Sequence, residues 1–384
     1  MKTINHKLLI VILAALSSVA PIATDTYIPS MSMIASYFDV EINLVELSLT
    51  IFLLGFASGQ FFGGPISDSI GRKKTSLIGL IGFSLFSYLI VFSSSIYELW
   101  ILRLMEAFFG GMVVVNANAT VRDLFEGKEA SRVFTLIGTL SMVAPLVAPA
   151  VGSLLIHFFT WKAIFVFLGT YGVFIFVMVF INIKETFTYA KQSFFEAYKN
   201  VLTNKKARSL IIVFPIVFSG MFIFISKSAF VYIEYFGVST DWFPFFFGSD
   251  VIFVMIMARL NLKLIKKYET LSIVKFGIFM QLLIAIALVI DLIHPTLLVM
   301  FILLTAYVSM LGIIFGNLTA LVLENFSKNA ATATAVVGVL NFTIGAIVAT
   351  IVSMFHDESL ISVAVGIFTT TTFSYFLIYR VKKN

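Results

Sequence analysis

The sequence predicts an all-α integral membrane protein with twelve membrane-spanning helices in two halves of six. Hydrophobic residues make up 60% of the 384 residues and charged residues only 12%, whereas soluble chains have about 45–50% and 25%. Apolar segments long enough to cross a hydrocarbon core, about 20 residues each, follow one another along the whole chain. Such segments must be helical because every backbone polar group in lipid needs an internal partner.

The twelve expected spans are separated by short polar turns. They cover about 7–36, 43–66, 74–94, 98–120, 131–156, 161–183, 208–236, 242–263, 270–292, 295–321, 330–355 and 358–380. The first is long and contains Pro21 and Pro29, which predicts a bend, because proline removes a helical hydrogen bond.

The basic residues predict the orientation. With the N-terminus in the cytoplasm, 23 of the 26 Lys and Arg residues fall on the cytoplasmic side, as the positive-inside rule requires. Trp100, Trp161 and Trp242 then all begin spans at the outer interface, where an aromatic belt is expected. Both termini are therefore predicted to be cytoplasmic, in a multi-pass membrane protein.

One long polar segment, 184–207, divides the spans six and six. The expected organisation is an N-terminal bundle over 1–183, a linker over 184–207 and a C-terminal bundle over 208–384. The absence of Cys removes thiolate metal sites and Cys nucleophiles. The net charge of +6 arises at the ends of apolar runs, which favours lipid headgroups over nucleic acid as its partner.

Five charged residues stand out within the predicted spans, where a charge costs about 2.5–3.5 kcal/mol at the bilayer centre and usually faces a wet cavity. They are Asp25, Arg103, Glu106, Lys227 and Asp250. At about 1.5 Å per helical residue, all five fall in the outer half of the membrane. They are therefore candidates for one functional constellation.

Asp25 is the strongest candidate for a proton carrier. A carboxylate in an apolar cavity takes up a proton readily, and a cation nearby favours its release. Such a group can load a proton at one face and release it when a cationic substrate arrives. The alternative is a structural Asp25 that is hydrogen-bonded to backbone freed by Pro21 or Pro29.

Arg103 and Glu106 are three residues apart on one helix face, and Asn118 lies on the same face as Arg103. The two charges can neutralise each other, or Arg103 can reach an acid on the first span. Lys227 can pair with Asp250 in the neighbouring span, or face Asp25 of the first span, since the first and seventh spans occupy equivalent positions in the two halves.

The turn Gly64–Lys74, Gly-Pro-Ile-Ser-Asp-Ser-Ile-Gly-Arg-Lys-Lys, resembles the loop between the second and third helices of major facilitator superfamily transporters. The resemblance implies the major facilitator fold, with two pseudo-symmetric six-helix bundles and the substrate site between them. It also implies an ionic latch of Asp68 and Arg72, with Gly64 and Gly71 allowing close helix approach and a tight turn.

The fifth span resembles the glycine/proline motif that marks antiporters of the superfamily. It carries Gly138, Pro145, Pro149 and Gly152. Small residues let helices approach closely, and the prolines bend the helix. Helix kinking alone is the alternative explanation of the same residues.

Several segments together resemble the bicyclomycin/chloramphenicol resistance (Bcr/CflA) branch of drug:proton antiporters. They include Asp25-Thr26-Tyr27-Ile28-Pro29, the turn, Arg103 with Glu106, and Val121-Arg122-Asp123-Leu124-Phe125. The resemblance implies that Asp25 carries the proton and Arg103 tunes it. It also implies that Asp123 joins the latch that closes the cytoplasmic side, and that Tyr27 lies near the substrate.

Two departures from that branch bear on coupling and substrate. Glu106 stands where Gln is common, which adds a second possible proton site. Lys227 and Asp250 stand where the branch usually has neutral residues, and we place both, with Tyr27 and Asn118, in the expected substrate cavity.

The expected function is proton-coupled export of small amphipathic compounds by alternating access, in the bacterial inner membrane, by a monomer that uses protons and no cofactor. The alternative in the same fold is proton-coupled or exchange transport of a small zwitterionic or anionic metabolite, which Lys227 favours. An enzyme is not expected, because the four His residues lack metal spacing and no hydrolase motif occurs. A receptor or scaffold would not explain five charges within the membrane.

Overall fold

The described part of the protein is helical and contains no strand. The computed structural model describes residues 6–125, 129, 133, 136–137, 140–141, 143–186, 194–204, 207–326, 330–355 and 359–381. The chain divides into two compact units, Met1–Lys191 and Gln192–Asn384. This division falls within the predicted linker, 184–207.

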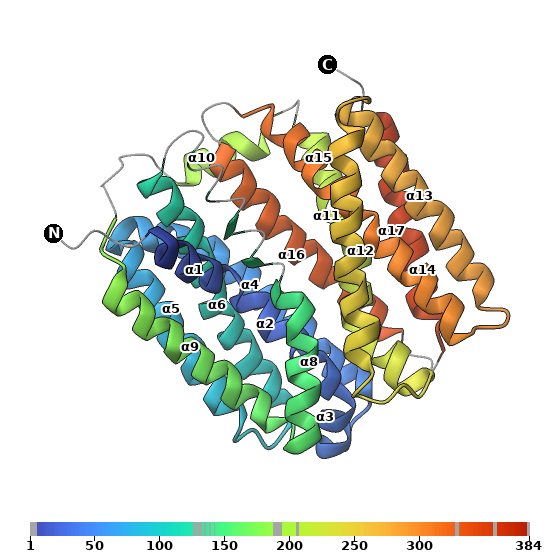
Figure 1. Ribbon diagram of the computed structural model, residues 1–384, viewed down its shortest axis with the longest axis horizontal. Coiled ribbons are helices and arrows are strands. Elements are labelled where there is room, and N and C mark those ends of the chain that lie inside the picture. The colour runs from blue at the N-terminus through green and yellow to red at the C-terminus, as the bar shows by residue number, and fades with distance from the viewer. Residues whose placement is uncertain are drawn as a thin grey trace. The chain divides into compact units, whose positions relative to one another are not determined.

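The first unit begins with a broken span (Figure 1). Helix α1 is bent by 45° against the following segment, Val19–Phe38. The bend lies close to Ser17, whose carbonyl oxygen receives no helical hydrogen bond from Pro21, because proline has no backbone N–H. The predicted bend is therefore confirmed. The helices of this unit are α1 (His6–Ser17), α2 (Val19–Asp25), the 3₁₀ turn η1 (Ile28–Ser30), α3 (Met31–Phe38), α4 (Ile42–Ile70), α5 (Arg72–Ile90), α6 (Ile96–Leu124), α8 (Val143–Phe158) and α9 (Lys162–Asn182).

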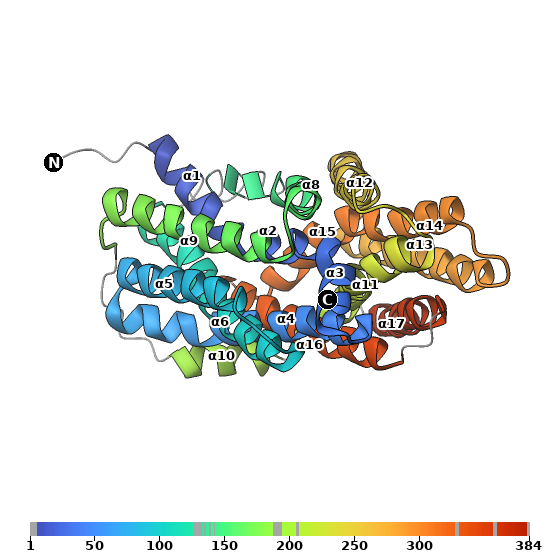
Figure 2. The same cartoon turned by 90° about the horizontal axis from the view of Figure 1, so that it is seen from below.

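Helices α4 and α6 pack at very short range because glycines recur every fourth residue on α4. A Cβ at Gly59 would collide with the Phe108 carbonyl oxygen, and one at Gly63 would lie 2.8 Å from the Met112 Cα. Gly55 and Gly59 therefore form a small-residue face of the kind that lets membrane helices approach closely. Helix α5 packs on α6 and α9 (Figure 2), so α4, α5, α6 and α9 form the frame of this unit.

The second unit is organised around α11, which packs against α16 and α17, while α12 packs against α14 and α15. The last residues of the α11 span form a π-helical turn, η2. The helices are α10 (Phe194–Leu202), α11 (Arg208–Ala229), η2 (Phe230–Tyr235), α12 (Phe243–Leu264), α13 (Thr270–Asp291), α14 (Leu297–Ser309), α15 (Leu311–Leu323), α16 (Ala330–Met354) and α17 (Ile361–Arg380).

Eight helices of the described residues are long and apolar enough to cross a membrane, and the bent first span brings the number to nine. Helices α5 and α6 occupy two further predicted spans, but α5 begins with three basic residues and α6 carries charges along its length. The shorter α8 occupies the described part of the fifth predicted span. Each of the twelve predicted segments thus contains helix.

Candidate functional site

The α4–α5 turn holds a compact charge network. Arg72 binds Asp68 on α4 through Nη1 at 2.5 Å and Asp123 at the end of α6 through Nε at 3.0 Å. Its Nη1 also donates to the Ser67 hydroxyl at 2.9 Å. The predicted latch residues Asp68, Arg72 and Asp123 are therefore brought together, and one guanidinium ties three helix ends to each other.

Gly71 forms the corner of this turn with φ +102° and ψ 157°, a conformation that is essentially restricted to glycine. The residue also allows a carboxylate to approach, because a Cβ there would lie 2.6 Å from the Glu185 Cδ. Gly64, the other predicted glycine of the motif, lies within α4.

Glu185, in the segment after α9, caps the start of α5. Its Oε1 accepts a hydrogen bond from the Arg72 backbone N–H at 2.7 Å, which places an anion at the positive end of the α5 dipole. In return, Lys73 Nζ donates to the Phe180 carbonyl near the end of α9 at 2.8 Å. The two helix ends therefore cap each other.

Asp25 is the last residue of α2 and is only 4% exposed. The Thr24 hydroxyl donates to its Oδ1 at 2.8 Å. Tyr27, two residues on, is fully buried, and its hydroxyl lies 2.6 Å from the Ser48 Oγ on α4. The junction of α2 and η1 thus buries a carboxylate and a phenol two residues apart.

Arg103 and Glu106, both fully buried on α6, form an ion pair at 2.7 Å. Glu106 also accepts a hydrogen bond from the Ser87 hydroxyl at 2.6 Å. The Arg103 guanidinium lies 4.5 Å from the Tyr27 ring centroid and 4.2 Å from that of Phe52, within cation–π range. Of the two alternatives for this pair, mutual neutralisation is the arrangement present.

Arg103 also extends toward the first span. Its Nη2 lies 3.5 Å from the Ala23 carbonyl oxygen, two residues before Asp25. Its Nε is buried and has no hydrogen-bond partner among the described residues. The guanidinium therefore keeps an unused donor beside the segment that carries Asp25.

Helix α8 packs against α2 and η1 of the first span. A Cβ at Gly152 would collide with the Thr26 carbonyl oxygen and lie 2.9 Å from the Pro29 Cγ. Pro145 and Pro149 both lie within α8, whereas Gly138 lies outside the described residues. The described part of the proline segment therefore touches the chain on both sides of Tyr27.

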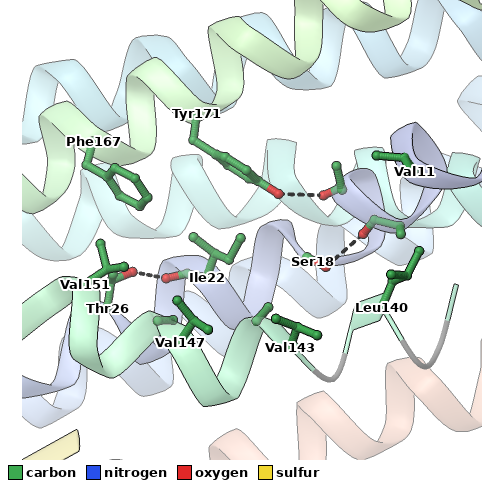
Figure 3. Close-up of a pocket in the computed structure, with 14 residues that line it drawn as sticks. Val11, Ser18, Ile22, Thr26, Leu140, Val143, Val147, Val151, Phe167 and Tyr171 are labelled. Atoms are coloured by element: carbon green, nitrogen blue, oxygen red, sulfur yellow. Dashed lines mark hydrogen bonds between the residues drawn. The ribbon is translucent and has the colours of Figure 1, made fainter. Parts of the chain in front are cut away.

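An apolar cavity of 310 Å³ lies beside α1 and α2 of the first span (Figure 3). Its walls come from the first span, α8 and α9, including Ile22, Val147 and Phe167. Tyr171 is at its edge and donates its hydroxyl to the Ala15 carbonyl at 3.0 Å. A cavity of this size and character suits an apolar fragment of a ligand.

The second unit buries two of the predicted charges. Lys227 on α11 is 1% exposed, and its Nζ lies 5.4 Å from the Phe230 ring centroid. Asp250 on α12 is 3% exposed and accepts a hydrogen bond from the Thr305 hydroxyl at 2.6 Å. Asn118, the remaining predicted cavity residue, is exposed on α6.

A family model described as the Major Facilitator Superfamily matches residues 13–350 of this chain. The chain belongs to the Major Facilitator Superfamily. It is therefore a multi-pass membrane transporter and not an enzyme, and the predicted all-α fold of that superfamily is confirmed.

Curated relatives support the branch that the motifs indicate. The chain is 31% identical over 353 residues to a bicyclomycin resistance protein homolog of Haemophilus influenzae, covering 90% of this chain and 88% of the relative. It is 27% identical over 259 residues to the chloramphenicol resistance protein CraA of Acinetobacter baumannii, covering 63% of this chain and 61% of the relative. The resemblance to the bicyclomycin/chloramphenicol resistance branch is confirmed.

Solved structures share the fold at low sequence identity. The xylose transporter XylE from E. coli, in a partially occluded inward open conformation, matches with a TM-score of 0.76 and 12% identity, over 98% of each chain. A D-xylose-proton symporter matches with a TM-score of 0.74 and 14% identity, over 97% of this chain and 98% of that one. These likenesses concern the major facilitator fold alone.

Sequence reasoning missed three features of this transporter. Glu46 on α4 is fully buried, although it is not among the five charged residues that the sequence singled out. Glu185 lies in the predicted linker, and nothing in the sequence indicates that it accepts a hydrogen bond from the Arg72 backbone N–H. Thr305 had no signal at all, since a threonine within an apolar span is unremarkable until its carboxylate partner is known.

Proposed function

We propose that this protein is a proton-coupled antiporter that exports small amphipathic compounds by alternating access. The observation that carries the proposal is Asp25, a carboxylate buried at the end of α2, two residues after the Ala23 carbonyl oxygen that lies 3.5 Å from Arg103 Nη2. The resistance functions in the names of the relatives support export of antibiotics or similar compounds. We further propose that the protein is a monomer in the bacterial inner membrane with both termini in the cytoplasm.

Asp25 is suited to carry the proton because its described partner is a neutral hydroxyl. An ionised carboxylate removed from water is costly unless it is paired, and the Thr24 hydrogen bond offsets only part of that cost. Proton binding relieves the remainder. A cationic or hydrogen-bonding substrate in the same place would relieve it equally, so proton and substrate compete.

Glu106 is less suited to that task. It already accepts hydrogen bonds from Arg103 at 2.7 Å and Ser87 at 2.6 Å, and two such donors stabilise the charged form. We propose that Glu106 is the counter-ion that holds Arg103. The unused Nε donor of Arg103 then remains available to Asp25 when the proton leaves.

The Arg72 network is proposed to close the cytoplasmic side in the outward-open state. Its ion pairs join α4, α5 and α6, and breaking them would let these helix ends separate. The α8 contact at Gly152 is proposed to transmit movement of the first span to the proline segment. The apolar cavity beside both elements is proposed to receive the hydrophobic part of the substrate.

The energy available is sufficient for efflux. One proton entering down a membrane potential of 100 mV releases about 2.3 kcal/mol, which corresponds to a concentration ratio of roughly 40-fold at about 1.4 kcal/mol per tenfold.

The test uses the purified protein in proteoliposomes with chloramphenicol as the probe and a pH-sensitive dye inside. An inward proton gradient should drive chloramphenicol transport, with proton flux in the opposite direction, and Asp25→Asn should abolish both. Asp39→Asn is the matched control, because Asp39 is exposed and its left-handed conformation (φ 54°) also suits Asn. Transport that is indifferent to the proton gradient would contradict the proposal and favour metabolite exchange.

A further inference from the structure

The second unit contains a buried polar cluster that the export mechanism above does not use. It consists of Asp250 on α12, Thr305 on α14 and Tyr232 in the π-helical turn η2. Their exposed fractions are 3%, 6% and 0%. The Thr305 hydroxyl donates to Asp250 Oδ1 at 2.6 Å. Three elements therefore converge on one carboxylate inside the membrane.

Tyr232 in η2 packs against the face of α12 that carries Asp250. Its ring is 6.3 Å from that of Phe243 and 5.2 Å from that of Phe246. Phe243, Phe246 and Asp250 are spaced i, i+3 and i+7, which places them on one helix face. The Asp250 carboxylate also acts electrostatically on the Tyr232 hydroxyl. A π-helical turn is rare and occurs frequently at functional sites.

Two polar atoms of this cluster are left without a partner. Asp250 Oδ2 and the Tyr232 hydroxyl are both buried, and neither has a hydrogen-bond partner among the described residues. A buried polar atom without a partner is rare in folded proteins and indicates a missing ligand, water or proton. Here the two unpartnered atoms are an acid oxygen and a hydroxyl, which are groups that one water can join.

The charges around Asp250 do not neutralise it by direct pairing. The ion pairs of the described residues do not include Asp250. Lys227 on α11 contacts the Phe230 ring, and Tyr307 on α14 pairs its hydroxyl with Thr371. Glu234 in η2 is exposed. Helix α15, the other element against α12, carries no titratable residue.

We propose that Asp250, together with Thr305 and Tyr232, forms a second proton-binding site, in the C-terminal half of this transporter. The proton comes from the aqueous phase and binds Asp250 Oδ2, which then donates to the Tyr232 hydroxyl directly or through one water. When the proton returns to water, both hydroxyls donate to the ionised carboxylate. This inference deepens the proposed function. Only one consequence rests on that function, namely that each transport cycle can move a proton at this site as well as at Asp25.

The site itself is tested without substrate, on the full-length protein in nanodiscs. Infrared titration from pH 4 to 10 should show a carboxylic C=O band that is lost as the pH rises and is absent from Asp250→Asn. Asp241→Asn, at an exposed aspartate of the same half, should retain the band. If Asp250→Asn leaves the pH-dependent carboxyl bands unchanged, the proposal is wrong. If sodium at constant pH removes the band as protons do, a cation site replaces the proton site and the proposal is also wrong.

Conservative variants separate this role from a structural one. Thr305→Val removes a hydroxyl that donates to the carboxylate and should move the midpoint of the band upward by about one pH unit, the equivalent of a single such hydrogen bond. Tyr232→Phe removes a hydroxyl that partners both forms of the acid, and it should move the midpoint upward by less, because the hydrogen bond to the charged form is the stronger of the two. A purely structural cluster would lose thermal stability with no movement of the midpoint. These variants also keep the test decisive if Asp250→Asn does not fold.

The consequence for transport is measured separately. The number of protons moved per chloramphenicol exported should fall in Asp250→Asn, whereas Asp25→Asn should abolish export. If the wild-type protein exports nothing, the proposed function fails while the infrared titration still decides the proton site. An unchanged ratio in Asp250→Asn would refute the coupling of this site.

Discussion

Replacing Gly71 with Ala tests how the α4–α5 turn is held together. Gly71 has φ +102° and ψ 157°, and a Cβ would lie 2.6 Å from the Glu185 Cδ. One methyl group therefore does two things: it strains the backbone, and it pushes Glu185 away from the Arg72 backbone N–H, which it meets at 2.7 Å.

The magnitude follows from these two parts. A residue with a side chain in this region of φ and ψ costs about 1–3 kcal/mol. Loss of the Glu185 cap adds about 0.5–1 kcal/mol, a value kept small because the carboxylate is exposed and water replaces part of the interaction. Gly71→Ala should therefore lower the free energy of unfolding by about 1.5–4 kcal/mol.

The assay is equilibrium unfolding in mixed micelles, followed by circular dichroism. Gly316→Ala is the control, because a Cβ at Gly316 meets nothing within 4 Å and alanine favours a helix by up to about 1 kcal/mol. In a Glu185→Ala background, Gly71→Ala should cost about 0.5–1 kcal/mol less, since the displaced carboxylate is already gone. The reasoning is refuted if Gly71→Ala is as stable as Gly316→Ala, or if the background makes no difference.

Two further substitutions probe the first unit with the same unfolding assay. Arg103→Met leaves the buried Glu106 carboxylate without its counter-ion and should lower the free energy of unfolding by about 3–5 kcal/mol. Most of that stability should be regained when Glu106→Gln is added. If it is not regained, Arg103 stabilises the protein through other contacts. Gly59→Ala places a methyl group against the Phe108 carbonyl oxygen and should lower the free energy of unfolding by about 1–3 kcal/mol through overpacking. Wild-type stability in this variant would mean that α4 and α6 can move apart without cost.

Much of the fold was accessible from the sequence because lipid allows few solutions. Apolar runs of the right length must be helices, and Pro21 predicted the bend that the first span shows. The close packing of α4 on α6 was also written in the sequence, as Gly55, Gly59 and Gly63 at intervals of four. The π-helical turn η2 was not, because a π turn and an α turn differ by a single backbone hydrogen-bond register that side-chain pattern does not encode.

The site was predictable only as far as charges identify it. A charged residue within an apolar span is visible in the sequence, so Asp25, Arg103 and Asp250 were found, and the i, i+3 spacing of Arg103 and Glu106 allowed their pairing. Neutral partners such as Thr305 leave no such signal, because hydroxyl residues occur throughout these spans and pair with whichever helix lies nearest.

The partners of each buried acid decide its chemistry more than its depth does. By depth alone, Glu106 and Asp25 were equal candidates for the proton. Glu106 has a guanidinium at 2.7 Å and a hydroxyl at 2.6 Å, and is thereby compensated as an anion. The described side-chain donors to Asp25 and Asp250 are single threonine hydroxyls, at 2.8 Å and 2.6 Å. One neutral donor offsets only part of the cost of a buried charge, so at both acids the gain or loss of a proton changes the energy of the site more than it does at Glu106.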